Sequence, residues 1–536
     1  MRSTFRWILL LFCGVCLHAA AQDFFLRTTG NDEHDGRSEA SAWKTPARAA
    51  QQTFSPGDRL TLESGAEFIG GLNLNISDGG NAEKPVLISS SGEKPATILS
   101  GDSDGIFIQD SGVAVRNLIF KGSGLQNQKV GIRMYNDRNG ADKRAGVRIE
   151  KCQVSGYGRA GIYIESSPED KSATGFKNVL IEDCTVSECR NYGIWSYGPE
   201  QPRGSWKYAH EDITVRRCEV FNIPGDPQKH DNHSGNGILI GSVDRALIEY
   251  CCAHHCGSKN GSHDGGPVGI WSYCGRDVVI QYCEAYANRA GVKALDGGGF
   301  DLDGGMTRSI LQYNYSHDND GAGYLIYSYK NAPHEFKDNI VRFNISINDG
   351  RRGEYGGIAV GHHGDQNINT LLHNNLVIVS GGEKLTASAL VTAQTMGLKE
   401  FNNVFIARKG AYLIGTWSLK PGTDLKFAGN AWLYEEPAAL LHGRKKCASL
   451  EEWLKLSSID PTTVPDTFGS ISAFPLVEAP VCWPEPPHTL AKRLQLTYAG
   501  KAAAIDPAAC GINNLPGTDF AGKKVESLKF PGPLAH

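Results

Sequence analysis

The sequence predicts an elongated all-β protein, a right-handed parallel β-helix solenoid of about ten or more coils. Three observations predict it: a strand-like segment recurs roughly every 32 residues, apolar and polar residues alternate within each copy, and glycine makes up 63 of 536 residues. Alternation with a period of two is typical of a strand with one buried face and is not typical of a helical repeat. Stacked coils also let a long chain exceed the size limit of an ordinary hydrophobic core.

Cysteine, and later asparagine, marks the end of a strand in each repeat. The marked positions, 30 to 34 residues apart, are Cys152, Cys184, Cys218, Cys251, Cys283, Asn314, Asn344 and Asn375. Equivalent residues of coils stacked about 4.8 Å apart form ladders. We therefore expect buried free thiols in the early coils and an asparagine ladder, whose amides satisfy one another, in the later ones. A second strand that opens with glycine, such as Gly193-Ile-Trp-Ser, follows in each copy and predicts two strands per coil.

The first 21 residues have the pattern of a secretory signal peptide. Arg2 and Arg6 precede an apolar run over residues 7–17, and small residues follow at 19–21. The run is too short to span a bilayer as a helix. We therefore expect a secreted protein, extracellular or periplasmic, that has no membrane span.

The rest of the chain divides into three parts. Residues 22–110 are expected to form an N-terminal cap and the first coils, residues 111–432 the β-helix with its loop insertions, and residues 433–536 a tail packed on it. Thr45 as N-cap before Pro46 predicts a short helix that covers the open end of the first coil. Leu450-Glu-Glu-Trp-Leu-Lys-Leu predicts another short helix, and Cys482 and Cys510 are candidates for a disulfide in the tail.

Composition excludes some partners. With 54 basic and 58 acidic residues the net charge is −4, so nothing draws the chain to nucleic acid. We expect a monomer whose partner is a polysaccharide or an oligosaccharide.

Three consecutive coils carry long insertions at one corner. The interval from the marker cysteine to the next strand is 9 residues after Cys184, but 19, 18 and 16 after Cys218, Cys251 and Cys283. Insertions on neighbouring coils stack into a wall and often mark the binding face of a repeat protein. Polar side chains in these loops and the following coils are candidates for substrate binding: His233, His263 and Arg352.

The strands that open with glycine predict an outward-facing surface beside this wall. If the residue after glycine points inward, alternation sends the next residues outward. The outward columns then place two carboxylates on one strand, Asp301 and Asp303, among the aromatics Trp195, Tyr197, Trp271, Tyr273 and Tyr327. Aromatic faces beside carboxylates suit a sugar chain. The alternative is that the long loops fold over the aromatics and make a second small core.

Two chemistries fit the carboxylates. Asp301 and Asp303 lie two apart on one strand, about 7 Å between Cα atoms, and could act as acid and base on a glycosidic bond. They could instead share Ca²⁺ with Asp318 or Asp320. The ion would then neutralise a uronate while Lys293 or His317 removes a carbon-bound proton, which is the reaction of a lyase.

Several short segments carry a family resemblance. They are Thr29-Gly-Asn-Asp-Glu-His-Asp-Gly, Trp43-Lys-Thr, Pro56-Gly-Asp-Arg-Leu, Lys84-Pro-Val-Leu-Ile and Thr518-Asp-Phe-Ala-Gly. With them the chain resembles the bacterial pectin-lyase-like right-handed β-helix proteins, a superfamily of polysaccharide lyases and glycoside hydrolases. The resemblance covers nearly the whole chain after residue 21 and implies the fold. It does not select an activity, because the group also includes epimerases and proteins with no known reaction.

We therefore expect a secreted carbohydrate-active enzyme that cleaves an extracellular polysaccharide by β-elimination or glycosidic hydrolysis. The alternative is a non-catalytic carbohydrate-binding or surface protein with the same groove.

Overall fold

The computed structural model describes residues 20–459 except 141, 264, 364–366, 392–394, 418, 420–422 and 436–439, together with 467–470, 518–519 and 524–525. Residues 1–19 of the expected signal peptide, and Cys482 and Cys510, lie outside the described residues.

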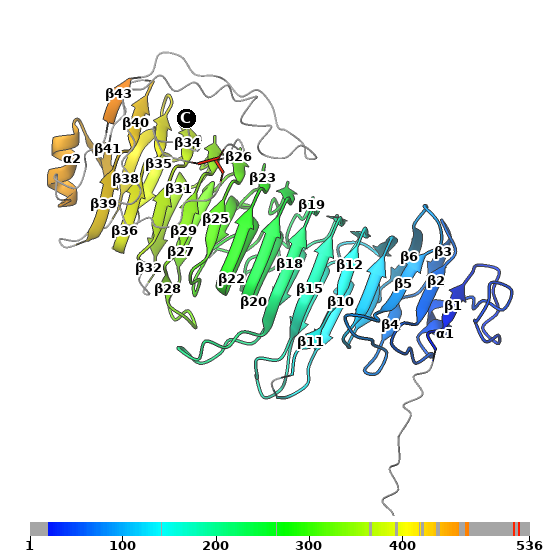
Figure 1. Cartoon of the computed structure of the whole chain (residues 1–536). Helices are drawn as coiled ribbons and strands as arrows, with labels where there is room; N and C mark the ends of the chain where they lie inside the picture. The colour runs from blue at the N-terminus through cyan, green and yellow to red at the C-terminus, as the bar shows by residue number, and fades with distance from the viewer. Residues whose placement is uncertain are drawn as a thin grey trace, which may run out of the picture.

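The chain winds as a parallel β-helix with three strands per coil (Figure 1). In one coil, β17 (Tyr192–Tyr197) is followed by β18 (His210–Arg216) and β19 (Glu219–Phe221). The next coil begins with β20 (Asn236–Glu249), which pairs in parallel with β17 and, after a bend, with β18. The prediction of two strands per coil is wrong, because β19 and its equivalents are mostly three or four residues long and too short to show alternation in the sequence.

We name the three faces of the β-helix by these strands. The first face contains β4 (Leu72–Leu74), β7 (Ile106–Ile108), β10 (Val130–Asn136), β14 (Ala160–Ser166), β17, the first halves of β20 and β22 (Val268–Gln281), β24 (Gly298–Leu302), β27 (Tyr324–Ser328), β31 (Gly356–His362), β35 (Ala387–Val391), β38 (Tyr412–Thr416) and β41 (Leu440–His442).

The second face contains β1 (Asp23–Leu26), β2 (Arg59–Leu62), β5 (Val86–Ser90), β8 (Val113–Arg116), β11 (Arg144–Ala145), β12 (Arg148–Glu150), β15 (Phe176–Glu182), β18, the second halves of β20 and β22, β25 (Ile310–Gln312), β28 (Phe336–Lys337), β29 (Ile340–Arg342), β32 (Asn367–Ile368), β33 (Leu371–His373), β36 (Met396–Phe401) and β39 (Asp424–Ala428).

The third face contains β3 (Glu67–Ile69), β6 (Ala96–Gly101), β9 (Leu118–Gly122), β13 (Gln153–Ser155), β16 (Thr185–Ser187), β19, β21 (Cys252–His254), β23 (Glu284–Tyr286), β26 (Tyr315–His317), β30 (Ile345–Ile347), β34 (Leu376–Val379), β37 (Val404–Ala407), β40 (Ala431–Tyr434) and β43 (Thr467–Ser470).

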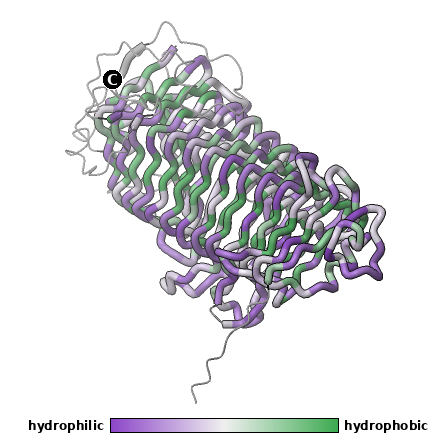
Figure 2. Tube along the Cα trace, turned by 45° about the vertical axis from the view of Figure 1, so that its right-hand side comes forward, coloured by the Kyte–Doolittle hydropathy of each residue, from purple (hydrophilic) through white to green (hydrophobic). Residues whose placement is uncertain are grey.

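Inward-facing apolar residues of successive coils form one continuous core. Ile162, Ile194, Ile238 and Ile270 follow the strand-opening glycines, pair in register and are fully buried. The hydropathy of the chain repeats from coil to coil in the same way (Figure 2). This confirms the predicted alternation and the all-β solenoid.

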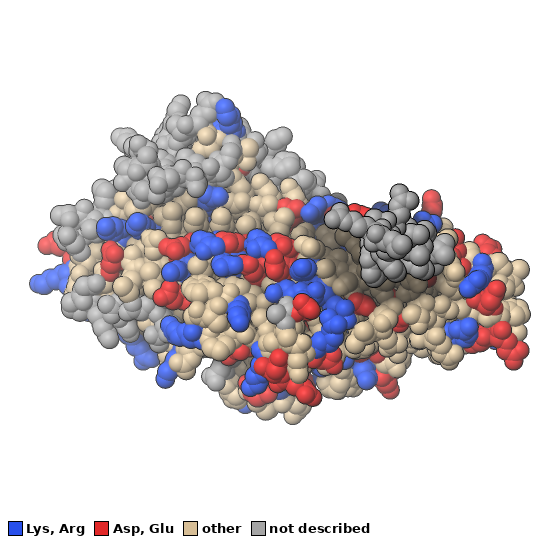
Figure 3. Space-filling view, turned by 60° about the horizontal axis from the view of Figure 1, so that its bottom comes forward, with Lys and Arg blue, Asp and Glu red and all other residues tan. Residues whose placement is uncertain are grey.

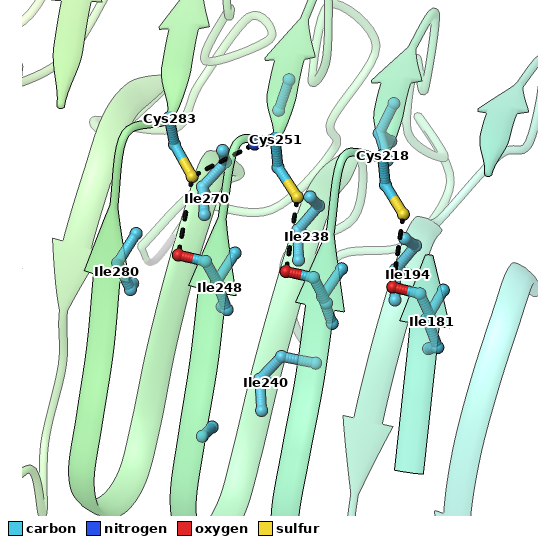
Figure 4. Close-up of a cluster of buried hydrophobic side chains, with 14 of the residues drawn as sticks. Ile181, Ile194, Cys218, Ile238, Ile240, Ile248, Cys251, Ile270, Ile280 and Cys283 are labelled. Carbon is cyan, nitrogen blue, oxygen red and sulfur yellow. Dashed lines mark hydrogen bonds between the residues drawn. The ribbon is translucent and has the colours of Figure 1, made fainter. Parts of the chain in front are cut away.

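The cysteine ladder lies at the corner between the second and third faces. Cys152, Cys184, Cys218, Cys251 and Cys283 are all buried, free thiols, as predicted. Each thiol donates to a main-chain carbonyl of the preceding coil, for example from Cys283 Sγ to the Ile248 oxygen at 3.7 Å (Figure 4). Small thiols therefore fill this corner without leaving a polar group unpaired.

In the later coils asparagine takes over the same corner. The side-chain oxygen of Asn344 accepts from both the main-chain N–H and the amide of Asn314, at 3.0 and 3.2 Å. Its own amide donates to the Leu311 carbonyl and to Asn375. The pattern continues through Asn403 to Asn430, so the predicted ladder is confirmed.

Both predicted helices are present. Helix α1 (Pro46–Ala49) starts at Thr45, whose hydroxyl accepts from the Arg48 N–H. Helix α2 (Leu450–Ser457) packs beside β41, its Trp453 is buried, and β42 (Lys445–Cys447) pairs antiparallel with β41. Parallel pairing continues past residue 432, through β41 and β43. The described part of the chain contains no helix that is both apolar and long enough to cross a membrane.

The described residues of the tail touch the β-helix. The hydroxyl of Tyr313 donates to the main-chain carbonyl of Thr518, and Asp519 is buried. This contact places Thr518 against the corner between the second and third faces.

We predict that Asn344→Leu destabilises the protein more than Cys251→Ala does. The leucine leaves the main-chain N–H and one amide hydrogen of Asn314 buried without an acceptor, at about 2 kcal/mol or more for the two. The alanine removes one buried sulfur at about 1–2 kcal/mol. Urea denaturation of both variants measures the difference. Equal losses would contradict the assigned role of the asparagine ladder.

Candidate functional site

An elongated groove of about 710 Å³ runs along the outside of the first face. Its floor comes from stacked strands: Trp195 on β17, Leu239 on β20, and Trp271 and Tyr273 on β22, with Asp303 directly after β24. The register pairs Trp195 with Leu239, Leu239 with Trp271, and Trp271 with Asp301. The predicted outward columns are therefore correct.

One wall of the groove is the inserted loop between β19 and β20. His233, Asn232, Gln228 and Lys229 line it. His233 packs edge-on against Trp271 at 5.2 Å and accepts from the Asn236 amide at 2.9 Å. Burial lowers the pKa of His233 to about 4, so this imidazole is neutral near pH 7 and takes part as a hydrogen-bonding group.

The opposite wall is the segment 198–209 between β17 and β18, which we call the strap. It reaches along the solenoid to the segment after β27, where the Gly204 N–H donates to the Pro333 carbonyl at 3.2 Å. Trp206 of the strap stacks on His334, with ring centroids 5.1 Å apart. Glu200 of the strap and Tyr329 both line the groove.

Three carboxyl groups gather at the end of the groove nearest β24. Asp303 lines the groove and is partly exposed, whereas Asp301 is only 3% exposed. Asp301 Oδ1 is buried, with no hydrogen-bond partner among the described residues. The third carboxyl is Asp296, on the inserted loop between β23 and β24, which accepts from the hydroxyl of Tyr355.

Burial raises the pKa of all three carboxyls. It raises the pKa of Asp303 to about 7, and the charge of Asp296 adds to the effect while the Gly304 N–H opposes it. Burial, together with the charges of Asp303 and Asp296, raises the pKa of Asp301 well above its usual range. Burial also raises the pKa of Asp296, but hydrogen bonds from Tyr355 and the Gly266 N–H favour its ionised form.

The loop that carries Asp296 is held by residues two coils further on. The guanidinium of Arg352 donates to the main-chain carbonyls of Gly291 and Val292, and is 3.9 Å from Asp320. With the bond from Tyr355 to Asp296, these contacts fix both ends of the loop tip.

The aromatics of the floor partly form the second small core considered as an alternative. Trp195 stacks on Tyr163 and Tyr192 at 4.1 and 4.0 Å, and Trp271 is only 4% exposed. Tyr197, at 38% exposed, and the partly exposed Tyr273 present more of their surface to the groove. The long loops therefore cover much of the aromatic column and leave a groove over the rest.

The structure brings together most of the predicted groove residues, but His317 of the lyase hypothesis lies on the third face. Trp195, Tyr197, Trp271, Tyr273, His233 and Asp303 line the groove. Tyr327 lies close enough for the charges of Asp303, Asp296 and Asp301 to raise its pKa, in addition to burial.

The two candidate bases lie on different parts of the β-helix. His317 is on the third face, stacked on Tyr286 and bonded to Glu284 and Asp318. Lys293 is exposed on the inserted loop. The position of His317 does not support a role as base beside Asp303, whereas the role of Lys293 stays a prediction.

The candidate metal ligands have other partners. Asp318 is bonded to Asn348 and Arg351 in addition to His317. Asp320 is paired with Arg289 at 3.4 Å. Within the described ranges no three His, Cys, Asp or Glu side chains are grouped as metal ligands.

Two substrate-binding candidates take other positions. His263 is exposed, 6.0 Å from the ring of His230, and Arg352 braces the inserted loop. The sequence places Asp296 among the ionisable residues of an inserted loop without selecting it as catalytic, and it does not indicate Glu200, Tyr329 or Tyr355. Asp296 could have been predicted, because it stands five residues before Asp301 in a glycine-rich segment. The other three residues reach the site only through the folding of distant loops.

Comparison with known proteins agrees with this architecture. The family model described as "Right handed beta helix region" matches residues 86–222 and 131–389, which together span more than half of the chain. The chain belongs to this family. It is also 24% identical, over 481 residues and 73% of its length, to a lacto-N-biosidase of Bifidobacterium longum subsp. longum. The chain spans 29% of the length of that relative.

Among solved structures, a GH136 lacto-N-biosidase from Eubacterium ramulus is similar, with a TM-score of 0.49 and 17% identity, over 78% of this chain and 68% of that one. The Dettilon tailspike protein is similar with a TM-score of 0.46 and 14% identity, over 71% and 65% of the two chains.

The raised pKa of Asp303 predicts how stability depends on pH. The folded protein holds this proton up to about pH 7, while the unfolded chain loses it near pH 4. The contribution of Asp303 is therefore fully present below about pH 4 and is lost as the pH rises to about 7. In the wild type this loss lowers the free energy of unfolding between about pH 4 and pH 7. We expect the decrease to be smaller in Asp303→Asn by about 2–4 kcal/mol.

Urea denaturation at several pH values measures this effect, with Asp231→Asn as an exposed control. An unchanged pH dependence in Asp303→Asn would show that the carboxyl is ionised throughout.

Proposed function

We propose that this chain is an exported glycoside hydrolase that cleaves a neutral extracellular oligosaccharide or polysaccharide. One observation carries the proposal: a partly exposed carboxyl with a pKa of about 7 stands at the end of an aromatic-lined groove, beside two further carboxyls. A carboxylic acid that keeps its proton near neutral pH can protonate a leaving glycosidic oxygen.

The other two carboxyls differ in what they can do. Asp301 is buried, its Oδ1 has no hydrogen-bond partner among the described residues, and its pKa is raised well above the usual range, which disfavours a second negative charge beside Asp303. Asp296 is partly exposed and accepts hydrogen bonds from Tyr355 and Gly266 that favour its ionised form. We assign Asp303 as the general acid and Asp296 as the partner that acts as base or nucleophile. The proposed catalytic pair is therefore Asp303 and Asp296, in place of the pair Asp301 and Asp303 expected from the sequence.

The groove favours hydrolysis over β-elimination. A lyase that works without a metal needs an unpaired basic side chain to neutralise a uronate, yet Arg159, Arg190 and Lys229 of this groove each form an ion pair. Arg159 pairs with Glu165 at 3.1 Å, Arg190 with Asp226 at 3.4 Å, and Lys229 with Asp231 at 2.9 Å. A neutral sugar is bound by such balanced groups through hydrogen bonds and ring stacking.

The matched relative is named a lacto-N-biosidase, which agrees with a hydrolytic role on sugars. Export rests on the signal-peptide pattern of the first 21 residues. Calcium-dependent β-elimination and a purely sugar-binding role are the two alternatives that the first experiment addresses.

The first experiment is an activity screen of the chain without its first 21 residues against neutral and uronate-containing glycans. Reducing ends and unsaturated-uronate absorbance are followed together, with Ca²⁺ and with EDTA. We expect new reducing ends without unsaturation, and losses of about 10³-fold or more in kcat for Asp303→Asn and Asp296→Asn. Lys293→Ala is the control and should stay within about twofold.

Each other result points to a different function. Unsaturated products that disappear in EDTA would replace the hydrolase with a calcium lyase and return attention to Lys293. Glycan binding without turnover, equal in the wild type and Asp303→Asn, would establish a binding protein.

Tyr355 provides a second test, because its hydroxyl stabilises the ionised form of Asp296. Tyr355→Phe should raise the pKa of Asp296 further and move the acidic limb of the kcat/KM profile upward by about one pH unit. Tyr327→Phe, beside the same carboxyls, is the matched control. A limb that does not move, with kcat merely lowered at every pH, would remove Asp296 from the proposed pair.

A further inference from the structure

A second hollow, of about 530 Å³, lies against the strap and is distinct from the groove. Lys143, Gln201, Trp206, Tyr208, Glu211 and Asp244 are among its lining residues. The strap separates the two spaces, since Glu200 lines the groove and its neighbour Gln201 lines this outer hollow. A chain that leaves the groove past Tyr197 would therefore cross the strap and reach the outer hollow.

Trp206 is held in place by contacts outside the hollow. Its φ of 52° lies in the left-handed region, which is unfavourable for a bulky side chain. His334 stacks on the indole and does not line the hollow, and Lys337 Nζ lies 5.8 Å from the ring centroid. Part of the indole surface is thus left to the hollow, on a ring fixed before any ligand arrives.

The hollow also contains an unsatisfied polar group and balanced charge. The hydroxyl of Tyr208 is buried and has no hydrogen-bond partner among the described residues. The Lys143 ammonium is 4.0 Å from Glu211, and Asp244 is paired with Arg276 at 2.7 Å. Acidic and basic side chains are mixed across the face shown in Figure 3. Neither a strongly anionic nor a strongly cationic ligand is favoured by such a surface.

We propose that this outer hollow is a second sugar-binding site, which takes neutral sugar units of a glycan that continues from the groove across the strap. Groups of this kind bind a neutral pyranose: the indole surface by stacking, and the amide and the paired charges by hydrogen bonding. The identity of the ligand as a glycan rests on the proposed function, but the site does not depend on turnover. The second site makes the affinity of the protein for a glycan increase with the length of the sugar chain.

The test measures binding in the Asp303→Asn background, so that no probe is consumed. The probes are soluble neutral polysaccharides (xyloglucan, galactomannan and arabinogalactan) in native affinity gels, and their fragments of two to eight sugars in calorimetry. We expect long fragments of one of these to bind about tenfold tighter than the shortest, which is a typical gain for a well-placed aromatic contact. Trp206→Ala should abolish that gain, and Trp206→Phe should keep most of it.

Two further variants keep the result interpretable. Ile69→Ala, at an exposed position on the third face, is a control that should leave binding unchanged. Tyr197→Ala should lower the affinity for short and long fragments alike. Trp206→Phe retains the packing of the strap, so a loss caused only by misfolding would appear in thermal denaturation of Trp206→Ala but not of Trp206→Phe.

The possible outcomes separate the two proposals. Length-dependent binding that Trp206→Ala removes, in a wild type that cleaves nothing, would support the second site and overturn the hydrolase. Cleavage with affinity that is independent of length, or unchanged in Trp206→Ala, would overturn the second site alone. If none of the probes binds the wild type, the second site is likewise overturned.

Discussion

Each coil depends on main-chain hydrogen bonds to equivalent residues of its neighbours. This constraint explains why the corners are as regular as the strands. At the corner between the second and third faces, an inward polar group is buried. It would lack a hydrogen-bond partner unless the next coil supplied one. Cysteine meets this requirement by being small and weakly polar, and asparagine meets it by matching its own amide. The ladder of Asn314, Asn344 and Asn375 therefore links each of the later coils to the next one.

A rigid first face makes it possible to build a groove from loops. The floor residues are fixed by parallel pairing, so Trp271 and Asp301 are neighbours whatever the loops do. The inserted loop with His233 and the strap with Glu200 then raise walls on the two sides. The strap also covers part of the corner between the first and second faces, and in doing so it creates the outer hollow beside Trp206. One loop thus shapes two spaces.

The chemistry of the site follows from burying acids close together. Asp301 and Asp303 share one strand, and Asp296 is brought beside them by a loop that Arg352 and Tyr355 hold. Loss of water raises the pKa of all three, but their hydrogen bonds differ, and those that Asp296 accepts from Tyr355 and Gly266 oppose the shift. This arrangement costs stability at neutral pH, which is a common property of functional sites.

The sequence alone determined the solenoid, its ladders, both short helices and the outward columns, because these depend on a local period repeated many times. It did not show the third strand of each coil, since strands such as β19 are too short to show a period. It also placed Asp301 and Asp303 correctly on one face, but it could not rank Asp296, Glu200 or Tyr355 among the site residues. Loop paths and burial decide which carboxyl meets the groove and which keeps its proton, and those properties exist only in the tertiary structure.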